Sequence, residues 1–397
     1  MDLVDRASAA YVEEYGGPPH RVAQAPGRVE LLGNHTDYNG GLVLSAGIDR
    51  HTVVAAGPRT DRLACLFSLD LAARDQFHVD HQASFDAAWT RYPRGVVWAL
   101  RERFGPLRSG FNAVILGDVP QGAGLSSSAS LEAALAWACL GLGLIDLPIN
   151  DSTRMDLART LQRAENVYVG VACGLLDQFS TLFAAADSAL MLDCANGHWE
   201  RLPLVDDQGL APAIVVCDSR TSRRLADGMY NRRRTECETV LDHYRQLRGN
   251  SLRWLRDLRL EDLERDWLAL DPVGRRRARH VLTENQRVEA GRDALQRADL
   301  KTFGRLMSES HESSRLDFEN SSEGLDRLIE AAREAPGFLG GKLSGAGWAG
   351  CTVNLVQAAA AADFASAVRD GVLRRGGPEP RLYVCRPAPG AGILEPR

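Results

Sequence analysis

This 397-residue chain lacks paired cysteines, long apolar runs and a large net charge, and each absence narrows the classes of protein to which it can belong. Its eight cysteines are scattered and form no Cys-x-x-Cys pair, so we expect reduced core thiols in a cytosolic protein. The most apolar stretch, Ala133 to Ile145, falls short of the ~18 residues that indicate a membrane span. A net charge of -5 gives no reason to expect nucleic acid or an anionic membrane as a partner.

Targeting signals and repeats are also missing from the sequence. Residues 1–17 are acidic and polar and do not resemble a signal peptide, so we expect a soluble protein of the cytoplasm. The chain has no internal repeat, and its one low-complexity tract is the alanine run at 358–362. Since 45% of the residues are hydrophobic, a chain of this length can bury a large core, and we expect two domains.

The order of the predicted elements favours an α+β fold. Strand patterns occur at 29–32, 43–48, 51–56, 63–67, 77–79, 111–116, 213–217, 352–355 and 381–385. Helical patterns occur at 2–15, 94–104, 128–144, 151–168, 175–185, 222–247, 260–268, 272–298, 300–312, 322–334 and 358–371. Because these elements mix without a regular β-α-β alternation, a doubly wound sheet is disfavoured. The polar, turn-rich stretch Val205–Gly209 predicts a boundary between domains 1–205 and 206–397.

The most informative segment, which we call the first island, is residues 117–132. An apolar strand leads into a loop with three glycines, and three serines, Ser126 to Ser128, then open a long Ala/Leu helix. Unpaired backbone N–H groups and the positive end of the helix dipole converge there, and glycine lets the backbone approach a ligand closely. We therefore predict a phosphate-binding loop. The alternative is a serine-capped helix after an ordinary turn. It is not a Walker loop, since the nearest match, Gly341-Lys342, is followed by Leu343.

A second island, residues 25–41, gathers Arg, Glu, Asn, His, Asp and Tyr between two apolar runs. Carboxylates and amides at a strand-to-loop junction suit a polyhydroxylated ligand, whose hydroxyls need fixed donors and acceptors. His35 and Asp37 as metal ligands are a weaker alternative because no third ligand lies nearby. A plain Gly/Asn turn is another. In a third island, residues 340–351, glycines crowd before an apolar strand, which predicts a backbone that approaches something closely, or simply a hairpin.

The three islands, together with segments at 163–166, 173–179 and 229–237, match one family. The chain resembles the galactokinases of the GHMP small-molecule kinase superfamily, nearly from end to end. The resemblance implies an N-terminal domain of the ribosomal-S5-like type and a ferredoxin-like C-terminal domain, with ATP and sugar meeting between them. It implies a transferase of galactose metabolism that phosphorylates the anomeric hydroxyl of galactose to galactose 1-phosphate.

The resemblance also assigns roles to residues. It implies that ATP is bound by Gly122, Ala123, Gly124, Leu125, Ser126, Ser127 and Ser128. Ser127 would ligand Mg²⁺ together with Glu165, although Ser126 or Ser128 is an open alternative. Asp177 matches the residue that removes the proton of the sugar hydroxyl or orients it, and Arg28 matches its partner. The implied sugar contacts are Asn34, His35, Asp37, Gly174 and Tyr230.

One exchange departs from the family pattern. The usual signature carries Asn where this chain has Glu30, and Glu where it has Asn34, and in the family that Glu contacts the C6 hydroxyl. Positions 30 and 34 lie roughly 13 Å apart in a strand, but they are neighbours in a helix. Asn34 would tolerate a carboxylate or a missing group at C6. The alternatives are therefore an anomeric kinase for galacturonate, N-acetylgalactosamine or a pentose, and, from another class, a non-catalytic sugar sensor.

The expected partner is a small-molecule sugar, with ATP and Mg²⁺ as cofactors and with neither nucleic acid nor membrane bound. The expected assembly is a monomer or weak oligomer in the cytoplasm.

Overall fold

The chain forms two β-sheets that are flanked by helices. The computed structural model describes residues 1–81, 88–171, 173–221, 228–249, 251–266 and 268–394. The larger sheet has the order β12-β1-β2-β5-β3-β4, with β6 and β7 attached beside β2, and the smaller has the order β11-β8-β10-β9. All neighbours are antiparallel except β3 and β5. The two sheets and their helices confirm the predicted α+β class.

The strands of the larger sheet are β1 (Arg21–Leu32), β2 (Leu42–Pro58), β3 (Leu63–Ser68), β4 (Ala73–His78), β5 (Phe111–Gly117), β6 (Ser188–Asp193), β7 (Trp199–Pro203) and β12 (Gly392–Leu394). The strands of the smaller sheet are β8 (Ala213–Asp218), β9 (Phe338–Leu343), β10 (Cys351–Val356) and β11 (Arg381–Cys385). The helices are α1 (Leu3–Tyr15), α2 (Arg91–Phe104), α3 (Ser127–Gly141), α4 (Asp151–Arg163), α5 (Leu176–Phe183), α6 (Met229–Arg248), α7 (Leu260–Arg265), α8 (Pro272–Gln296), α9 (Leu300–Ser313), α10 (Glu323–Arg333) and α11 (Ala361–Arg374).

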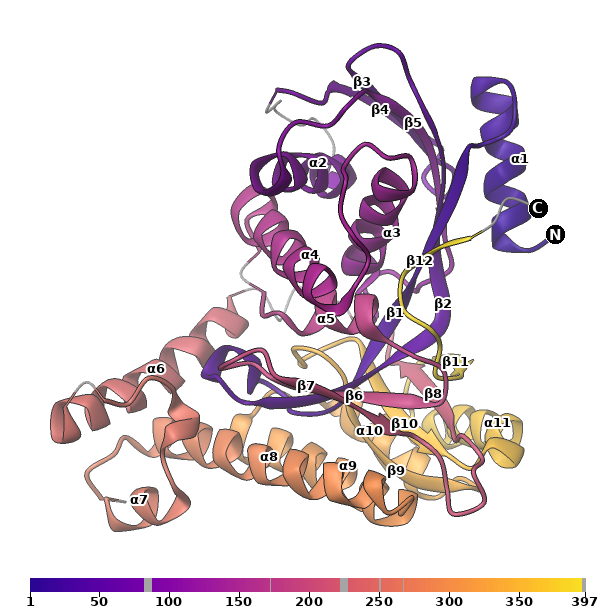
Figure 1. The fold of residues 1–397 in the computed structure, drawn as a ribbon. Helices are drawn as coiled ribbons and strands as arrows, with labels where there is room; N and C mark the ends of the chain where they lie inside the picture. The colour runs from indigo at the N-terminus through magenta and orange to yellow at the C-terminus, as the bar shows by residue number, and fades with distance from the viewer. Residues whose placement is uncertain (82–87, 172, 222–227, 250, 267, 395–397) are drawn as a thin grey trace.

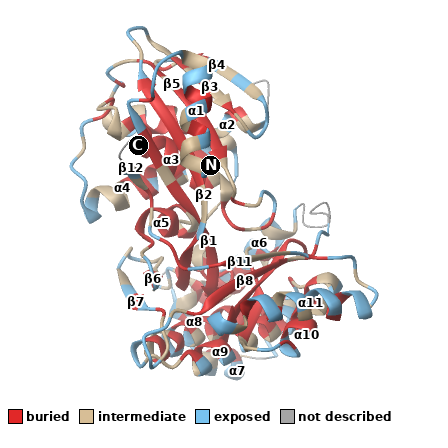
Figure 2. Ribbon diagram, turned by 90° about the vertical axis from the view of Figure 1, so that its right-hand side faces the viewer, coloured by how far each residue is buried: buried red, intermediate tan, exposed pale blue. Residues whose placement is uncertain are grey.

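The long antiparallel pair of β1 and β2 passes through both halves of the molecule (Figure 1). At one end, Ala25 and Val54 pack in a core with α3 and the other helices that cover the larger sheet. At the other end, Val29 and Leu44 share a second core with the smaller sheet and α9. The register of the pair shifts between Pro26 and Gly27, where the chain leaves one core and enters the other. Figure 2 shows the buried strands running through both halves.

Helix α3 explains the apolar stretch seen in the sequence. Every residue from Ala133 to Cys139 is buried, so the Ala/Leu run is the centre of a protein core. Small alanine side chains let this helix lie close against β1 and β2, while α1 covers the opposite face of the same sheet (Figure 1). Among the described residues, no helix is long and apolar enough to cross a membrane.

Several predicted boundaries differ from the observed ones. The strands predicted at 43–48 and 51–56 are one strand, β2, because β1 pairs with both of its halves, with β6 beside the first half and β5 beside the second. The helix predicted to run to 168 ends at Arg163 and continues as a π-helical turn, Ala164–Val169. The sequence patterns missed β6, β7, β9 and β12. Of the helix predicted at 222–247, residues 222–227 lie outside the described residues, and α6 begins at Met229.

The predicted boundary at 205/206 falls between β7 of the larger sheet and β8 of the smaller one. The last strand, β12, returns to pair with β1 in the larger sheet, beside residues 22–24. The division into domains 1–205 and 206–397 therefore stays a prediction.

Candidate active site

A cavity of about 380 Å³ lies where the three glycine-rich islands meet. Its volume falls in the range of small-molecule sites. Every predicted site residue lines the cavity except Ala123 and Glu165. The lining residues are Arg28, Glu30, Asn34, His35, Asp37, Gly122, Gly124, Leu125, Ser126, Ser127, Ser128, Val171, Cys173, Gly174, Leu176, Asp177, Tyr230, Ser344, Gly345, Ala346, Gly347 and Ala349.

The first island forms one wall of the cavity between β5 and α3. Ser126 precedes the helix in the left-handed conformation, with φ 56°, and its side chain makes no capping bond. The Ser126 hydroxyl oxygen is buried and has no hydrogen-bond partner among the described residues. A buried hydroxyl without a partner in a native structure calls for an explanation, and a ligand oxygen would supply one. The simpler interpretation of the loop, a serine-capped helix, is therefore wrong.

Glu165 lies behind this wall, in the π-helical turn that follows α4. Its carboxylate accepts a hydrogen bond from Gln178 Nε2 at 3.1 Å. Burial raises the pKa of Glu165, and the nearby Cys173 and Ser128 side chains counteract part of that increase. Both Ser127 and Ser128 line the cavity.

Arg28 connects Asp177 to the first island. From β1, its Nε and Nη2 atoms donate to Asp177 Oδ1 at 2.8 and 2.5 Å, and its Nη1 donates to the Gly124 carbonyl at 2.7 Å. Asp177 stands in the first turn of α5, where the helix dipole favours a negative charge. Its side chain is 27% exposed, whereas that of Arg28 is 6% exposed. The carboxylate therefore faces the cavity with a fixed orientation.

Asp37 and Gly174 meet on the opposite side of the cavity. A Cβ atom on residue 174 would overlap Asp37 Oδ2, so only glycine allows this contact. Burial, followed by the nearby carboxylates of Glu30 and Asp177, raises the pKa of Asp37 to about 7. Three carboxylates therefore act on one another within this cavity.

His35 and Tyr230 form an aromatic side of the cavity. The Ala346 carbonyl can only accept, so His35 Nε2 carries the proton and donates to it at 3.0 Å. His35 Nδ1 then accepts from the Tyr38 hydroxyl at 2.9 Å. Burial lowers the pKa of His35 to about 3, so the ring is neutral. Tyr230 reaches this group from α6, with its ring centroid 5.4 Å from that of His35.

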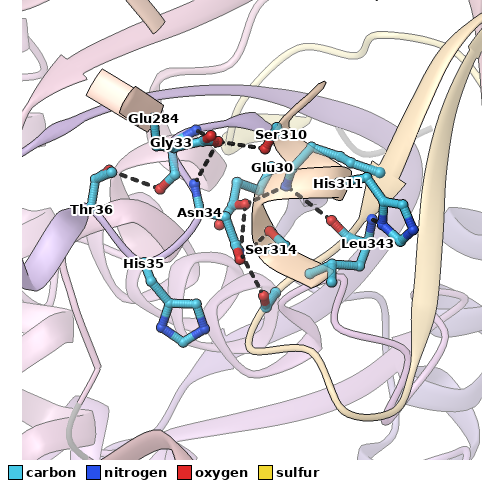
Figure 3. A network of polar contacts seen from close by, with 12 residues as sticks. Glu30, Gly33, Asn34, His35, Thr36, Glu284, Ser310, His311, Ser314 and Leu343 are labelled. Atoms are coloured by element: carbon cyan, nitrogen blue, oxygen red, sulfur yellow. Dashed lines mark hydrogen bonds and ion pairs between the residues drawn. The ribbon is translucent and has the colours of Figure 1, made fainter. Parts of the chain in front are cut away.

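Asn34 lies beside Glu30, as in a helix, although Glu30 belongs to a strand. β1 ends at Leu32, and the chain reverses, so the Asn34 side chain returns to the strand and its Nδ2 donates to Glu30 Oε1 at 3.0 Å. The same Nδ2 donates to the Gly345 carbonyl at 2.8 Å. Its Oδ1 accepts from Asn320 at 2.9 Å and from Ser314 at 3.4 Å (Figure 3). Asn34 is 1% exposed and is bonded to protein on both amide atoms.

The loop that carries Asn34 is held by helix α8, which the sequence analysis did not connect to it. Glu284 Oε1 accepts from the backbone N–H groups of Gly33 at 2.9 Å and Asn34 at 3.2 Å, and from the Ser310 hydroxyl at 2.6 Å (Figure 3). His280, one turn earlier, bonds with the Asn34 carbonyl at 2.9 Å. Glycine-rich patterns identify the loop itself, but nothing local in the sequence indicates these partners about 250 residues away.

The third island lines the cavity with Ser344 to Gly347. The glycines of this island predicted a backbone that approaches something closely, and what it approaches is other backbone of the same chain. A Cβ on Gly340 would overlap the Gly304 carbonyl, and one on Gly347 would overlap the Asn320 carbonyl. Ala123 does not line the cavity. Its backbone carbonyl accepts a hydrogen bond from the Cys351 thiol at the end of this island. The smaller sheet is thereby joined to the first island.

No metal or nucleotide is part of this structure, but the donor set can be compared with what each needs. Among the described residues there is no group of three or more His, Cys, Asp or Glu side chains placed to hold a metal ion. Mg²⁺ bound together with phosphates needs only one or two protein carboxylates, and Glu165, near the Ser128 side chain, would supply one.

Three family models match the chain. The model described as the galactokinase galactose-binding signature matches residues 9–58. The models of the GHMP kinases N terminal domain and the GHMP kinases C terminal match residues 91–185 and 292–372.

Curated relatives match over nearly the whole chain. A galactokinase from Roseiflexus sp. (strain RS-1) is 41% identical over 382 residues, which is 96% of this chain and 95% of the relative. A galactokinase from Chloroflexus aggregans is 40% identical over 97% of this chain and 96% of the relative. The crystal structure of Lactococcus lactis galactokinase complexed with galactose has a TM-score of 0.90 at 30% identity, covering 99% of this chain and 100% of that one. A mevalonate kinase crystal structure, at 17% identity and a TM-score of 0.62, shares the fold.

Proposed function

This chain belongs to the galactokinase family of the GHMP kinases, and we propose that it transfers the terminal phosphoryl group of ATP to the anomeric hydroxyl of galactose, giving galactose 1-phosphate and ADP. One observation carries the proposal. The same cavity joins a serine loop with an unpartnered buried hydroxyl, suited to phosphate oxygens, to a carboxylate-rich wall, suited to a sugar.

We propose that the first island binds the phosphates of ATP through Gly122, Ala123, Gly124, Leu125, Ser126, Ser127 and Ser128. The Ser126 hydroxyl supports this role, because it has no hydrogen-bond partner among the described residues. Backbone N–H groups at the start of α3 add a favourable dipole. Glu165 would hold Mg²⁺ together with Ser127 or with Ser128, both of which line the cavity. Bound Mg²⁺ would neutralise charge on the phosphate oxygens.

We assign Asp177 to the attacking hydroxyl. Its carboxylate is exposed to the cavity, and Arg28 fixes one of its oxygens while also bonding to Gly124 in the first island. A carboxylate in this position accepts the hydroxyl proton or orients the hydroxyl toward the phosphoryl group. The Arg28 guanidinium lies between the two substrates, where positive charge stabilises the transferring phosphoryl group.

The sugar would lie against Asp37, Gly174, His35 and Tyr230. Gly174 packs against Asp37 Oδ2 at the cavity wall, and among the described residues no cationic side chain forms a hydrogen bond with the Asp37 carboxyl. A carboxyl group of this kind binds hydroxyl groups well. Both ring nitrogens of His35 are already bonded within the protein, so His35 would act by placing its ring and backbone. Tyr230 offers an aromatic face to the apolar side of a sugar ring.

A coupled ADP-release assay with MgATP tests the function. The acceptors would be galactose, glucose, N-acetylgalactosamine, galacturonate, arabinose and 6-deoxygalactose. We expect galactose to have the highest kcat/KM. Strong turnover of another sugar alone would replace galactose as the substrate, and no turnover of any sugar would favour the non-catalytic sensor.

Asp177→Asn separates catalysis from binding. The variant should retain ATP binding and lose turnover, because an amide can neither take the hydroxyl proton nor form an ion pair with Arg28. A thermal-shift titration with ATP and the ADP-release assay measure the two properties. An active Asp177→Asn enzyme would contradict the assignment.

A further inference from the structure

The exchanged pair, Glu30 and Asn34, differs in what each side chain has left to offer a ligand. Asn34 has two N–H donors, which Glu30 and the Gly345 carbonyl take up, and one carbonyl oxygen, which accepts from Asn320 and Ser314. The amide is therefore saturated by the protein. Although Asn34 lines the cavity, its amide has no hydrogen-bonding capacity left to recognise a sugar group.

Glu30 is in the opposite situation. It shares a face of β1 with Arg28, two residues earlier, and it lines the cavity. Both of its bonds to other side chains fall on Oε1, from Lys342 Nζ at 2.6 Å and from Asn34 Nδ2 at 3.0 Å. Since a carboxylate accepts about four hydrogen bonds over its two oxygens, Oε2 retains acceptor capacity on the cavity side.

Lys342 supports Glu30 from behind. Its side chain is 0% exposed, lies on β9 and does not line the cavity, so it neutralises Glu30 without reaching a ligand. An ammonium buried this deeply requires a charged partner. The ion pair fixes the Glu30 carboxylate rather than offering a cation to substrate.

Among the described residues, three of the four charged ones that line the cavity are carboxylates, at Glu30, Asp37 and Asp177, and the fourth is Arg28. Arg28 is bonded to Asp177 and the Lys342 ammonium is bonded to Glu30, so both cations are already paired. Burial, together with the carboxylates of Glu30 and Asp177, raises the pKa of Asp37. Hydroxyl groups donate to such a surface, but a ligand carboxylate would be placed among like charges.

We propose that Glu30, and not Asn34, is the sugar-contacting residue of this pair, and that its carboxylate selects neutral, hydroxyl-bearing sugars and rejects acidic ones. Asn34 is a positioning residue, which holds Glu30 and joins it to the third island through Gly345. This inference rests on the proposed sugar-kinase function. It reverses the expectation that Asn34 opens the site to galacturonate.

The test compares sugars as well as variants. kcat/KM is measured for galactose, for its 2-, 3-, 4- and 6-deoxy derivatives and for galacturonate, with the wild type, Glu30→Gln and Asn34→Ala. Loss of one charged hydrogen bond predicts a fall of about tenfold to hundredfold for galactose in Glu30→Gln. In Glu30→Gln, the kcat/KM of one of the deoxy sugars should no longer fall below that of galactose. The ratio of kcat/KM for galacturonate to that for galactose should rise at least about tenfold. Asn34→Ala should lower kcat/KM for every sugar by a similar factor.

Glu30→Gln leaves Lys342 buried without its charged partner, which destabilises the folded protein. The double variant Glu30→Gln/Lys342→Met removes both charges and keeps the test valid if the single variant does not fold. An unchanged galacturonate ratio in both variants would overturn the proposal, as would a deoxy effect that vanishes in Asn34→Ala instead. If the wild type phosphorylates galactose, those results refute only the role of Glu30. A wild type that phosphorylates no neutral sugar overturns the proposed function, and this inference with it.

Discussion

Replacing Glu284 with glutamine tests whether helix α8 holds the sugar-site loop. The Glu284 carboxylate is 0% exposed and accepts from two backbone N–H groups, at Gly33 and Asn34, and from the Ser310 hydroxyl. Its other oxygen accepts from Arg287 Nε at 2.6 Å. A glutamine keeps a single acceptor oxygen. If that oxygen remains on the loop, the amide N–H₂ faces Arg287, and two donors meet without an acceptor.

Two independent arguments give the expected magnitude. Removing one member of a buried ion pair costs about 3–5 kcal/mol, because the other charge stays buried. Burial alone would raise the pKa of Glu284, but Arg287, His280 and Lys342 lower it from 4.5 to about 2. That fall corresponds to about 3 kcal/mol of stabilisation of the folded state. We therefore expect Glu284→Gln to lower the free energy of unfolding by about 3–5 kcal/mol at pH 7.

Urea unfolding followed by circular dichroism measures this change, with Glu309→Gln as the matched control. Glu309 forms an exposed ion pair with Arg305 on α9, so its loss should cost at most about 1 kcal/mol. The Glu284 contribution is complete above pH 4.5 and is lost as the pH falls through about 2, so the wild type and the variant should converge in acid. The KM for sugar should rise more than that for ATP. A loss below about 1 kcal/mol with unchanged KM values would refute the reasoning.

Three further predictions concern the cavity wall. Gly174→Ala should raise the KM for galactose at least about tenfold without changing the KM for ATP, because the new methyl group displaces Asp37. Gly392→Ala is the control, because a Cβ at that position meets nothing within 4 Å. Ser126→Ala should raise the KM for ATP without loss of thermal stability, whereas Ser130→Ala, which removes a fully bonded hydroxyl, should destabilise the protein by about 1–3 kcal/mol. Asp37→Asn should gain stability relative to the wild type as the pH rises from about 4 to about 7, because the raised pKa of Asp37 favours the folded wild type only in acid. If the difference in free energy of unfolding, measured with urea, did not depend on pH, it would contradict that pKa.

The parts of the site that the sequence predicted are those built from short segments. Glycines and serines at 122–128 indicate a phosphate loop because the strand, loop and helix that create it are contiguous. The pairing of Asn34 with Glu30 was not predictable in the same way. It depends on a reversal at Gly33, where φ is 98° and a Cβ would lie 2.6 Å from the Leu42 carbonyl. The distance expected along a strand did not apply, because the strand had already ended.

The remaining contacts join segments far apart in the chain. Glu284 and Lys342 bond with residues 30–34, and Ser310 bonds with Glu284. The segments around Glu284 and Ser310 were predicted only as helices, and the third island gave no sign that Lys342 pairs with Glu30. Buried polar partners of this kind are selected by tertiary packing, so neither propensity nor periodicity indicates them. The short strands β6, β7 and β12 were missed for a related reason, since each is defined by the strand beside it.

The β1–β2 pair determines how the two halves of the enzyme can move around bound substrates. Its hydrogen bonds continue on both sides of the shift at Pro26 and Gly27, so the two halves share one β-ribbon. A closing motion of the halves would therefore twist this ribbon, and irregular steps such as this one are compliant points. Arg28 follows that step directly, with Asp177 bonded to it. Twisting of the ribbon would therefore turn the proposed catalytic pair together with the backbone that carries it.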